Sequence, residues 1–304
     1  MRPAILITGI TGFLGSHIAE NLVSHSIQVI GLKRKDSDVW RCEEFKDKII
    51  WVDIDEKGFF KEELEKHSFD VIIHAAWIGV ESDSRDNWNV QSKNIPFLVS
   101  LLEVAKTVGV EKFVFLGSQA EYGNIDGKIS EDQKTNALNA YGSMKLACLE
   151  IVKTFCETNS INWVWLRLFS LFGEKENQNW LIPSLITSML TTEQMDFTPG
   201  EQKYAYLYVK DYALIMKRII TMPVESGVYN ISSDQTRTIK SLVEDIRDHI
   251  NPEFILNFGA LNYRENQSMH MEGDILKLCS QIGEVEFTDY NEALSNSLNY
   301  YIKK

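Results

Sequence analysis

The stretch that decides the fold is Thr8-Gly9-Ile10-Thr11-Gly12-Phe13-Leu14-Gly15-Ser16-His17. It follows a short apolar run, Ile5 to Ile7, and precedes apolar residues at helical spacing, Ile18 and Leu22. The three glycines permit a tight turn, close approach of the backbone to a pyrophosphate and close helix packing, while the helix N-terminus offers free N–H groups. Because Gly-x-x-Gly-x-x-Gly stands here between a strand and a helix, it predicts a phosphate-binding turn.

Short apolar runs alternate with helix-like stretches through the first half of the chain. These runs are Ile5 to Ile7, Gln28 to Leu32, Ile49 to Val52, Val71 to His74, Phe113 to Leu116 and Trp163 to Leu166. Strands this apolar are buried on both faces, as in a parallel sheet covered by helices. The alternation predicts an α/β fold built on a doubly wound parallel sheet.

The second half of the chain is less regular. After Gly173 come a helix-like stretch at Ser184 to Leu190, a Pro199-Gly200 turn, and a strand at Lys203 to Val209 that we expect to return to the sheet. We therefore expect a dinucleotide-binding domain made of residues 1–172 with roughly 203–230. Residues 173–202 and 231–304 are expected to form a smaller C-terminal α/β domain that binds substrate.

Composition and charge restrict the class of partner. The 304 residues include 31 basic and 43 acidic side chains, a formal net charge of -12, which is the wrong sign for binding nucleic acid or anionic membranes. No apolar run approaches the roughly 20 residues of a membrane span, so a cytoplasmic location is expected. The four cysteines, at 42, 148, 156 and 279, have no spacing typical of a disulfide framework or a zinc site, and no metal is expected.

Two further patterns carry chemistry. Tyr141-Gly142-Ser143-Met144-Lys145 places a Tyr and a Lys four residues apart on one helix face, where a cation can lower the pKa of the phenol and make it a usable proton donor or acceptor. Ser118 follows an apolar run and lies at the carboxyl end of a predicted strand, where ligands bind in open α/β sheets. Either pattern alone also fits an ordinary surface helix or turn.

Together these residues resemble the extended short-chain dehydrogenase/reductases, the group of nucleotide-sugar epimerases, dehydratases and reductases. The likeness rests on the glycine pattern, on Ser118 four places before Tyr122-Gly123, and on Tyr141-x-x-x-Lys145. It implies a Rossmann-type sheet and a catalytic set in which Tyr141 is the acid or base. Lys145 would hold the nicotinamide ribose and lower the tyrosine pKa, and Ser118 would hydrogen-bond the reacting sugar oxygen.

The resemblance also implies cofactor contacts. Asp53-Ile54 matches the adenine contact, His74-Ala75-Ala76 matches the strand end beneath the cofactor phosphates, and Asn94 matches a structural position on a helix. The expected cofactor-binding residues are Thr8, Gly9, Thr11, Gly12, Phe13, Leu14, Gly15, Lys33, Arg34, Asp53, Ile54, Ala75, Ala76, Tyr141 and Lys145.

The end of the second predicted strand bears on the choice of cofactor. Lys33-Arg34-Lys35 stands where NAD-preferring relatives carry an Asp or Glu for the ribose 2'-OH. A guanidinium suits a 2'-phosphate, so the sequence favours NADPH/NADP, although three basic residues also fit an exposed turn. A consumable reductant suits a ketoreductase, whereas NAD, the alternative, suits an epimerase that recycles its hydride.

Departures from the family pattern narrow the activity. Dehydratases carry Asp-Glu after the Ser or Thr, but Gln119 and Ala120 stand here, and no Cys lies near Ser118 as in the epimerase-reductases. A softer likeness, including the stretch 258–267, is to 4-keto-6-deoxyhexose reductases such as CDP-abequose synthase. The expected substrate-binding residues are Ser118, Gln119, Asn179 and Arg264. Many relatives carry a second Arg before the strand that ends near Val209, and this chain has Tyr204 there.

The expected function is therefore NADPH-dependent reduction of the C4 ketone of a nucleotide-linked 4-keto-6-deoxy sugar, for surface-polysaccharide synthesis. An NAD-dependent nucleotide-sugar 4-epimerase is the alternative, and a non-catalytic sensor of the NADPH/NADP ratio is a third hypothesis. A homodimer is also expected, because helices near Asn94 to Lys106 and Tyr141 to Cys156 carry extra apolar residues and form a four-helix contact in similar proteins.

Overall fold

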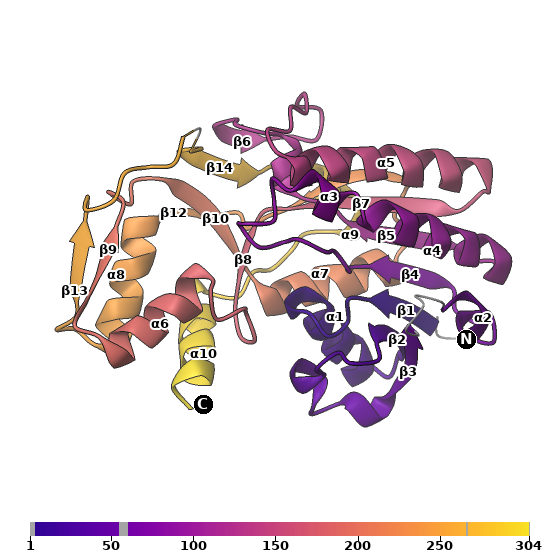
Figure 1. Ribbon diagram of the computed structural model, residues 1–304, viewed down its shortest axis with the longest axis horizontal. Helices are drawn as coiled ribbons and strands as arrows, with labels where there is room; N and C mark the ends of the chain where they lie inside the picture. The colour runs from indigo at the N-terminus through magenta and orange to yellow at the C-terminus, as the bar shows by residue number, and fades with distance from the viewer. Residues whose placement is uncertain (1–3, 55–59, 266, 304) are drawn as a thin grey trace.

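The computed structural model describes residues 4–54, 60–265 and 267–303. Asn266, within the stretch 258–267 noted above, lies outside the described residues. Among the described residues, seven parallel strands form the larger sheet (Figure 1), in the spatial order β11-β7-β5-β4-β1-β2-β3. Its strands are β1 (Ala4–Thr8), β2 (Gln28–Arg34), β3 (Ile49–Ile54), β4 (Val71–His74), β5 (Lys112–Leu116), β7 (Asn162–Leu168) and β11 (Gly227–Ile231). All six apolar runs are strands of this sheet, which confirms the predicted fold class.

Helices cover both faces of this sheet. Helices α1 (Phe13–Ser24) and α7 (Val209–Thr221) pack on one face, and α4 (Asn94–Val108) and α5 (Ala140–Thr158) on the other (Figure 1). In β1, Ile5 and Ile7 belong to the first core while Leu6 belongs to the second. Successive strand side chains point to opposite faces, so an all-apolar strand fills two cores at once.

A second sheet lies beyond the carboxyl ends of these strands. It contains β12 (Thr236–Thr238), β10 (Lys203–Tyr208), β14 (His270–Gly273) and β6 (Gly127–Ile129), with β8 (Ser170–Phe172) pairing with β10. The expectation that the strand near 203–209 returns to the larger sheet is therefore wrong. Strand β11 occupies the position beside β7, with Tyr229 opposite Leu166, and β10 pairs with β8, β12 and β14 instead.

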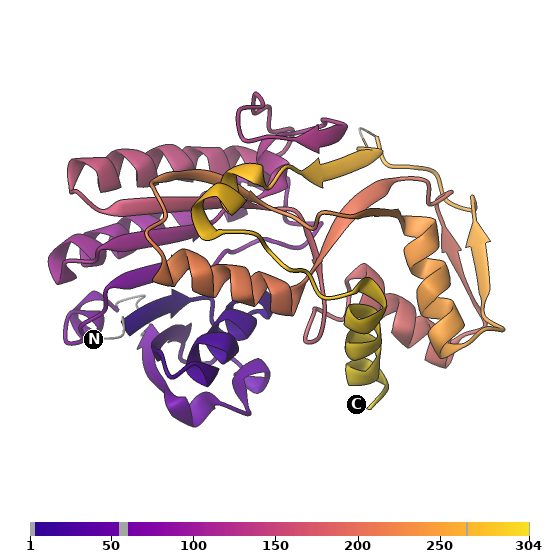
Figure 2. The same cartoon turned by 180° about the vertical axis from the view of Figure 1, so that it is seen from behind.

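Most of the remaining elements build the end of the molecule away from the larger sheet. They are α6 (Leu181–Thr191), β9 (Gln194–Phe197), α8 (Ile239–Ile250), β13 (Ile255–Phe258) and α10 (Tyr290–Ile302). Helix α9 (Leu276–Ile282) instead packs beside β11 and α7 of the larger sheet. Figure 2 shows α9 and the segment that leads to α10 on the face of the molecule turned away from the viewer in Figure 1. Helix α3 (Trp88–Gln91) follows the loop after β4. Short elements are α2 (Lys61–Leu64) and the 3-10 turns η1 (Trp40–Cys42), η2 (Lys46–Lys48) and η3 (Gln119–Glu121). Within the described ranges, no helix has the length and apolar character needed to cross a membrane.

Candidate active site

The glycine-rich turn joins β1 to α1 as the sequence predicts. Gly9 has φ +68°, and a Cβ there would lie 2.6 Å from the Ala76 nitrogen, so only glycine lets the turn approach the end of β4 so closely. The Gly12 N–H donates to the Gly9 carbonyl at 3.0 Å. Gly12 caps α1 without any side-chain hydrogen bond, which leaves the helix N-terminus able to bind an anion.

A cavity of about 580 Å³ opens over this turn. It lies at the point where the strand order reverses between β1 and β4, the usual ligand site of doubly wound sheets. Predicted cofactor residues that line it are Thr8, Gly9, Thr11, Gly12, Phe13, Leu14, Gly15, Lys33, Arg34, Ile54, Ala75 and Ala76. The structure therefore gathers most of the predicted cofactor contacts around one cavity.

Two cations mark the β2 side of the cavity. Lys33 and Arg34 both line it, and Lys33 Nζ lies 2.7 Å from Asp53 Oδ1 on the neighbouring strand β3. Asp53, a predicted cofactor contact, does not line the cavity, but it is paired with Lys33, which does. The β2 end thus presents cations to the cavity, and cations suit the phosphates of a dinucleotide.

Buried polar contacts fix the β4 end of the cavity. The Ala76 N–H donates to Thr8 Oγ1 at 3.2 Å, and Thr8 Oγ1 lies 2.7 Å from His74 Nδ1. Burial, with a smaller effect from Lys145, lowers the pKa of His74 to about 3, so its imidazole is neutral. Asn94 holds the next residues: its Oδ1 accepts from the Ile78 N–H at 2.8 Å and its Nδ2 donates to the Ile78 carbonyl at 3.1 Å. These contacts of His74 and Asn94 hold the backbone at the β4 end of the cavity in place.

The three predicted catalytic residues lie together, and two of them, Tyr141 and Lys145, contact Trp77 of the cavity wall. Ser118 follows the end of β5, and α5 begins at Ala140 with the Asn139 side chain accepting from the Gly142 N–H at 2.8 Å. Tyr141 is hydrogen-bonded to Ser118. Lys145 Nζ donates to the Leu116 carbonyl at 2.7 Å and lies 5.6 Å from the centre of the Tyr141 ring. A strand end and one helix face therefore bring the hydroxyl, phenol and ammonium groups together.

Burial dominates the electrostatics of this trio. It lowers the pKa of Lys145 to about 7 and raises the pKa of Tyr141, while the Ser118 hydrogen bond and the charge of Arg85 oppose the tyrosine shift. The expectation that Lys145 lowers the pKa of Tyr141 is thus wrong for the chain by itself. The physical reason is that both groups are buried, which penalises the phenolate and the ammonium alike.

The predicted substrate residues are less closely grouped. Gln119 adjoins Ser118, and its buried Oε1 has no hydrogen-bond partner among the described residues. Asn179 is exposed in the turn before α6 and does not line the cavity, whereas Asn177 does. Arg264 lies beyond β13, where its charge acts to lower the pKa of Tyr204. No hydrogen bond within the described ranges joins Asn179 or Arg264 to the catalytic trio.

Asn177 is the centre of a bridge that sequence patterns did not reveal. The Arg41 guanidinium donates from Nη1 to the Thr11 carbonyl at 3.3 Å and from Nη2 to Asn177 Oδ1 at 2.9 Å. Asn177 Nδ2 donates to Glu81 Oε1 at 2.9 Å. The bridge thus connects the glycine-rich turn with the loop that follows β4. Four segments far apart in sequence meet in it, so no local motif signals it.

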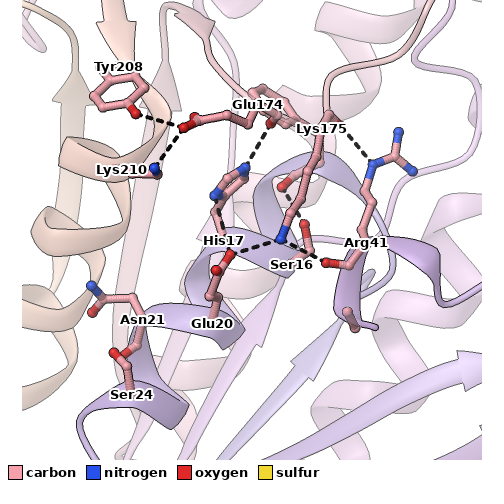
Figure 3. A network of polar contacts seen from close by, with 12 residues as sticks. Ser16, His17, Glu20, Asn21, Ser24, Arg41, Glu174, Lys175, Tyr208 and Lys210 are labelled. Atoms are coloured by element: carbon pink, nitrogen blue, oxygen red, sulfur yellow. Dashed lines mark hydrogen bonds and ion pairs between the residues drawn. The ribbon is translucent and has the colours of Figure 1, made fainter. Parts of the chain in front are cut away.

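A neighbouring network of hydrogen bonds and ion pairs holds the segment 173–177 against α1. Figure 3 shows His17, whose Nε2 lies 2.8 Å from the Glu174 carbonyl, and Lys175, whose ammonium contacts Glu20 Oε2 at 3.0 Å. Glu174 Oε1 accepts from the Tyr208 hydroxyl at 2.9 Å. These contacts link the helix that begins at the glycine-rich turn to the first residues of the C-terminal part.

Comparison with known proteins identifies the class to which this site belongs. The sequence profile described as the NAD dependent epimerase/dehydratase family matches residues 5–232. The chain therefore belongs to the NAD-dependent epimerase/dehydratase family. It is an NAD(P)-dependent enzyme whose relatives are nucleotide-sugar oxidoreductases and epimerases.

Individual relatives point to more than one activity. The chain is 26% identical over 317 residues to an uncharacterized UDP-glucose epimerase of Bacillus subtilis, covering 97% of each protein. It is 24% identical over 276 residues to CDP-abequose synthase of Salmonella muenchen, covering 88% of each. The structure resembles UDP-glucuronic acid 4-epimerase from Bacillus cereus, in complex with UDP-glucuronic acid and NAD, with a TM-score of 0.87, 21% identity and 99% of each chain covered.

Proposed function

We propose that this protein reduces the C4 ketone of a nucleotide-linked 4-keto-6-deoxy sugar with NADPH. The observation that carries the proposal is the placement of Lys33 and Arg34 on the cavity wall at the end of β2. A dissociable reductant is what a ketoreductase needs, and a cationic β2 end favours the phosphorylated form of the cofactor. The likeness to CDP-abequose synthase supports the same activity.

The chain's own residues account for the remaining chemistry. When bound, NADPH supplies a hydride to C4 and leaves as NADP. Tyr141 gives its proton to the oxygen at C4, which becomes a hydroxyl, and Ser118 holds that oxygen by hydrogen bonding. Lys145, buried beside Trp77 at 3.7 Å from its ring centre, binds the cofactor ribose.

Substrate binding is assigned to the C-terminal part, residues 173–202 and 231–304. Gln119 contacts the sugar through its side-chain amide, and Asn179 and Arg264 contact the diphosphate. Binding energy from the nucleotide then positions the reacting carbon. Such an enzyme would serve surface-polysaccharide synthesis.

A nucleotide-sugar 4-epimerase is the second candidate. It is favoured by the similarity to a UDP-glucose epimerase and by the fold shared with an NAD-bound UDP-glucuronic acid 4-epimerase. The same trio would then act twice, first accepting and then returning the proton at the C4 oxygen. The two candidates differ in their cofactor, because an epimerase keeps its dinucleotide through turnover.

One experiment separates the candidates and a non-catalytic sensor. Purified protein is denatured and the released dinucleotide identified, and NADPH oxidation is followed at 340 nm with a panel of nucleotide-linked 4-keto-6-deoxy sugars. Oxidation of free NADPH supports the reductase. Stoichiometric bound NAD with interconversion of nucleotide hexoses supports the epimerase, and cofactor binding without turnover of either panel supports a sensor.

We also propose that the protein forms a homodimer through α4 and α5. These helices lie side by side on one face of the sheet (Figure 1), and Val99 of α4 is an apolar residue exposed there. Sedimentation should give a mass twice that of one chain, and the Val99→Glu variant should sediment with the mass of a single chain.

A further inference from the structure

A buried carboxylate lies directly behind the serine of the active site. Glu121 closes the 3-10 turn η3 that Ser118 caps, and its side chain is fully buried. The Ser118 N–H donates to Glu121 Oε1 at 2.8 Å, while Ser118 Oγ accepts from the Ala120 N–H at 3.1 Å. This reciprocal capping box fixes the backbone of the turn that carries Ser118.

Strand β7 supplies the other partners of this carboxylate. Trp165 Nε1 donates to Oε1 at 3.0 Å, and Arg167 Nε donates to Oε2 at 2.8 Å. A Cβ on Gly117 would lie 2.6 Å from Glu121 Oε1, so the glycine before Ser118 is required by this arrangement. The Ser118 N–H, the Trp165 indole and the Arg167 guanidinium all donate to this carboxylate, a set that suits its ionised form.

The charge of Glu121 also affects the pKa values of Lys145 and Tyr141. Burial raises the pKa of Glu121, and the ion pair with Arg167 opposes that shift. Glu121 in turn acts to raise the pKa of Lys145 and of Tyr141. The other titratable groups that face the two residues are His74 and Cys148 beside Lys145, and Arg85 beside Tyr141.

A pair this deeply buried is a poor source of stability, because desolvating both ions offsets most of their attraction. We propose that Glu121 is a positioning residue: paired with Arg167, it holds the Ser118 turn in its reactive geometry and keeps a negative charge behind Lys145. This inference rests on the proposed function, since it concerns how the same trio acts. It applies equally to ketone reduction and to epimerisation.

The test separates positioning from folding with a matched set of variants. Glu121→Gln removes the charge but leaves Arg167 buried without its partner, so its stability is expected to fall. The double variant Glu121→Gln with Arg167→Gln removes both charges and should recover the melting temperature. Glu131→Gln is the control, because Glu131 Oε1 accepts from the Asn230 N–H at 2.7 Å and its carboxylate has no hydrogen bond to Ser118 or Arg167 within the described ranges.

Positioning predicts that the double variant keeps KM within about threefold of wild type while kcat falls about 30-fold. Ketone reduction needs the protonated phenol, so activity is lost as the pH rises through the pKa of Tyr141. Because this pKa falls without Glu121, the double variant should lose activity at a lower pH than wild type. The Glu131→Gln control should keep kcat within about twofold of wild type. If the double variant recovers the wild-type kcat and pH profile along with the melting temperature, the proposal is overturned, because the Glu121–Arg167 pair would then serve only the stability of the fold.

If wild type turns over no nucleotide sugar, the proposed function fails, and amide exchange decides the positioning claim separately. In cofactor-bound protein, the amides of residues 118–121 should exchange at least about tenfold faster in the double variant than in wild type. Equal exchange rates would show that Glu121 does not hold the Ser118 turn.

Discussion

Lys33 Nζ lies 2.7 Å from Asp53 Oδ1 and joins the ends of β2 and β3 at the edge of the cofactor cavity. The Lys33 side chain is mostly buried, whereas that of Asp53 is about half exposed. Lys33 is thus held at the cavity wall while Arg34, one residue further along β2, also faces the cavity. This arrangement leads to the first prediction.

Lys33→Asp should reverse the cofactor preference. An acid at the end of β2 repels a 2'-phosphate and accepts a hydrogen bond from a ribose 2'-OH, so NADPH should bind about 10 to 100 times more weakly and NAD more tightly. Lys35→Asp is the control, since Lys35 is exposed and does not line the cavity. Dissociation constants from cofactor fluorescence provide the measurement, and an unchanged NADPH affinity in Lys33→Asp would count against the assignment.

Tyr141→Phe should remove the proton donor and leave binding in place. We expect kcat to fall by about 100-fold or more, with KM and melting temperature close to wild type. Tyr263→Phe is a suitable control, because its hydroxyl contacts only the Glu201 N–H among the described residues, at 3.1 Å. Full activity in Tyr141→Phe would show that another group transfers the proton.

Cofactor affinity should depend on pH through Lys145. Burial lowers the pKa of this residue to about 7, so the ammonium is present below that pH and is lost as the pH rises through it. In the proposed site this ammonium binds the cofactor ribose, so affinity should weaken between about pH 6 and 9. Lys145→Met should bind weakly at every pH and lack this dependence, as titration calorimetry of cofactor binding can establish. A wild-type affinity that is constant over this range would refute the prediction.

Asn177→Ala should accelerate cofactor release. Asn177 bridges Arg41 and Glu81 across the cavity, and its removal breaks two hydrogen bonds at 2.9 Å. We expect the dissociation rate to rise about tenfold. Asn179→Ala, two residues away in the exposed turn, should release the cofactor at the wild-type rate. Stopped-flow displacement measures both, and equal rates for the two variants would mean that the bridge does not retain the cofactor.

Local patterns predicted the larger sheet and the glycine-rich turn between β1 and α1 well. Both depend on short-range features: two-sided apolar strands and glycines placed between a strand and a helix. The strand near 203–209 shows the limit of such patterns. The sequence predicts a strand there, but it does not tell which strand is its neighbour. Strand β11 occupies the place beside β7 in the larger sheet, so β10 pairs in the second sheet instead.

The site was predicted to the extent that its residues lie in continuous motifs. Ser118, Tyr141 and Lys145 come together because one strand end meets one helix face. Asn177 escaped prediction, although its neighbour Asn179 was singled out, because its role depends on Arg41 and Glu81 approaching from other segments. The pKa of Tyr141 was misjudged because the depth of burial is not visible in a sequence.

The most direct test of the account is NADPH oxidation by the purified protein with nucleotide-linked 4-keto-6-deoxy sugars, followed at 340 nm beside Tyr141→Phe. The account predicts that wild type oxidises one mole of NADPH for each mole of sugar reduced at C4, and that the variant is at least about 100-fold slower. Silence with every 4-keto sugar, together with turnover of an unmodified nucleotide hexose by protein-bound NAD, would contradict it.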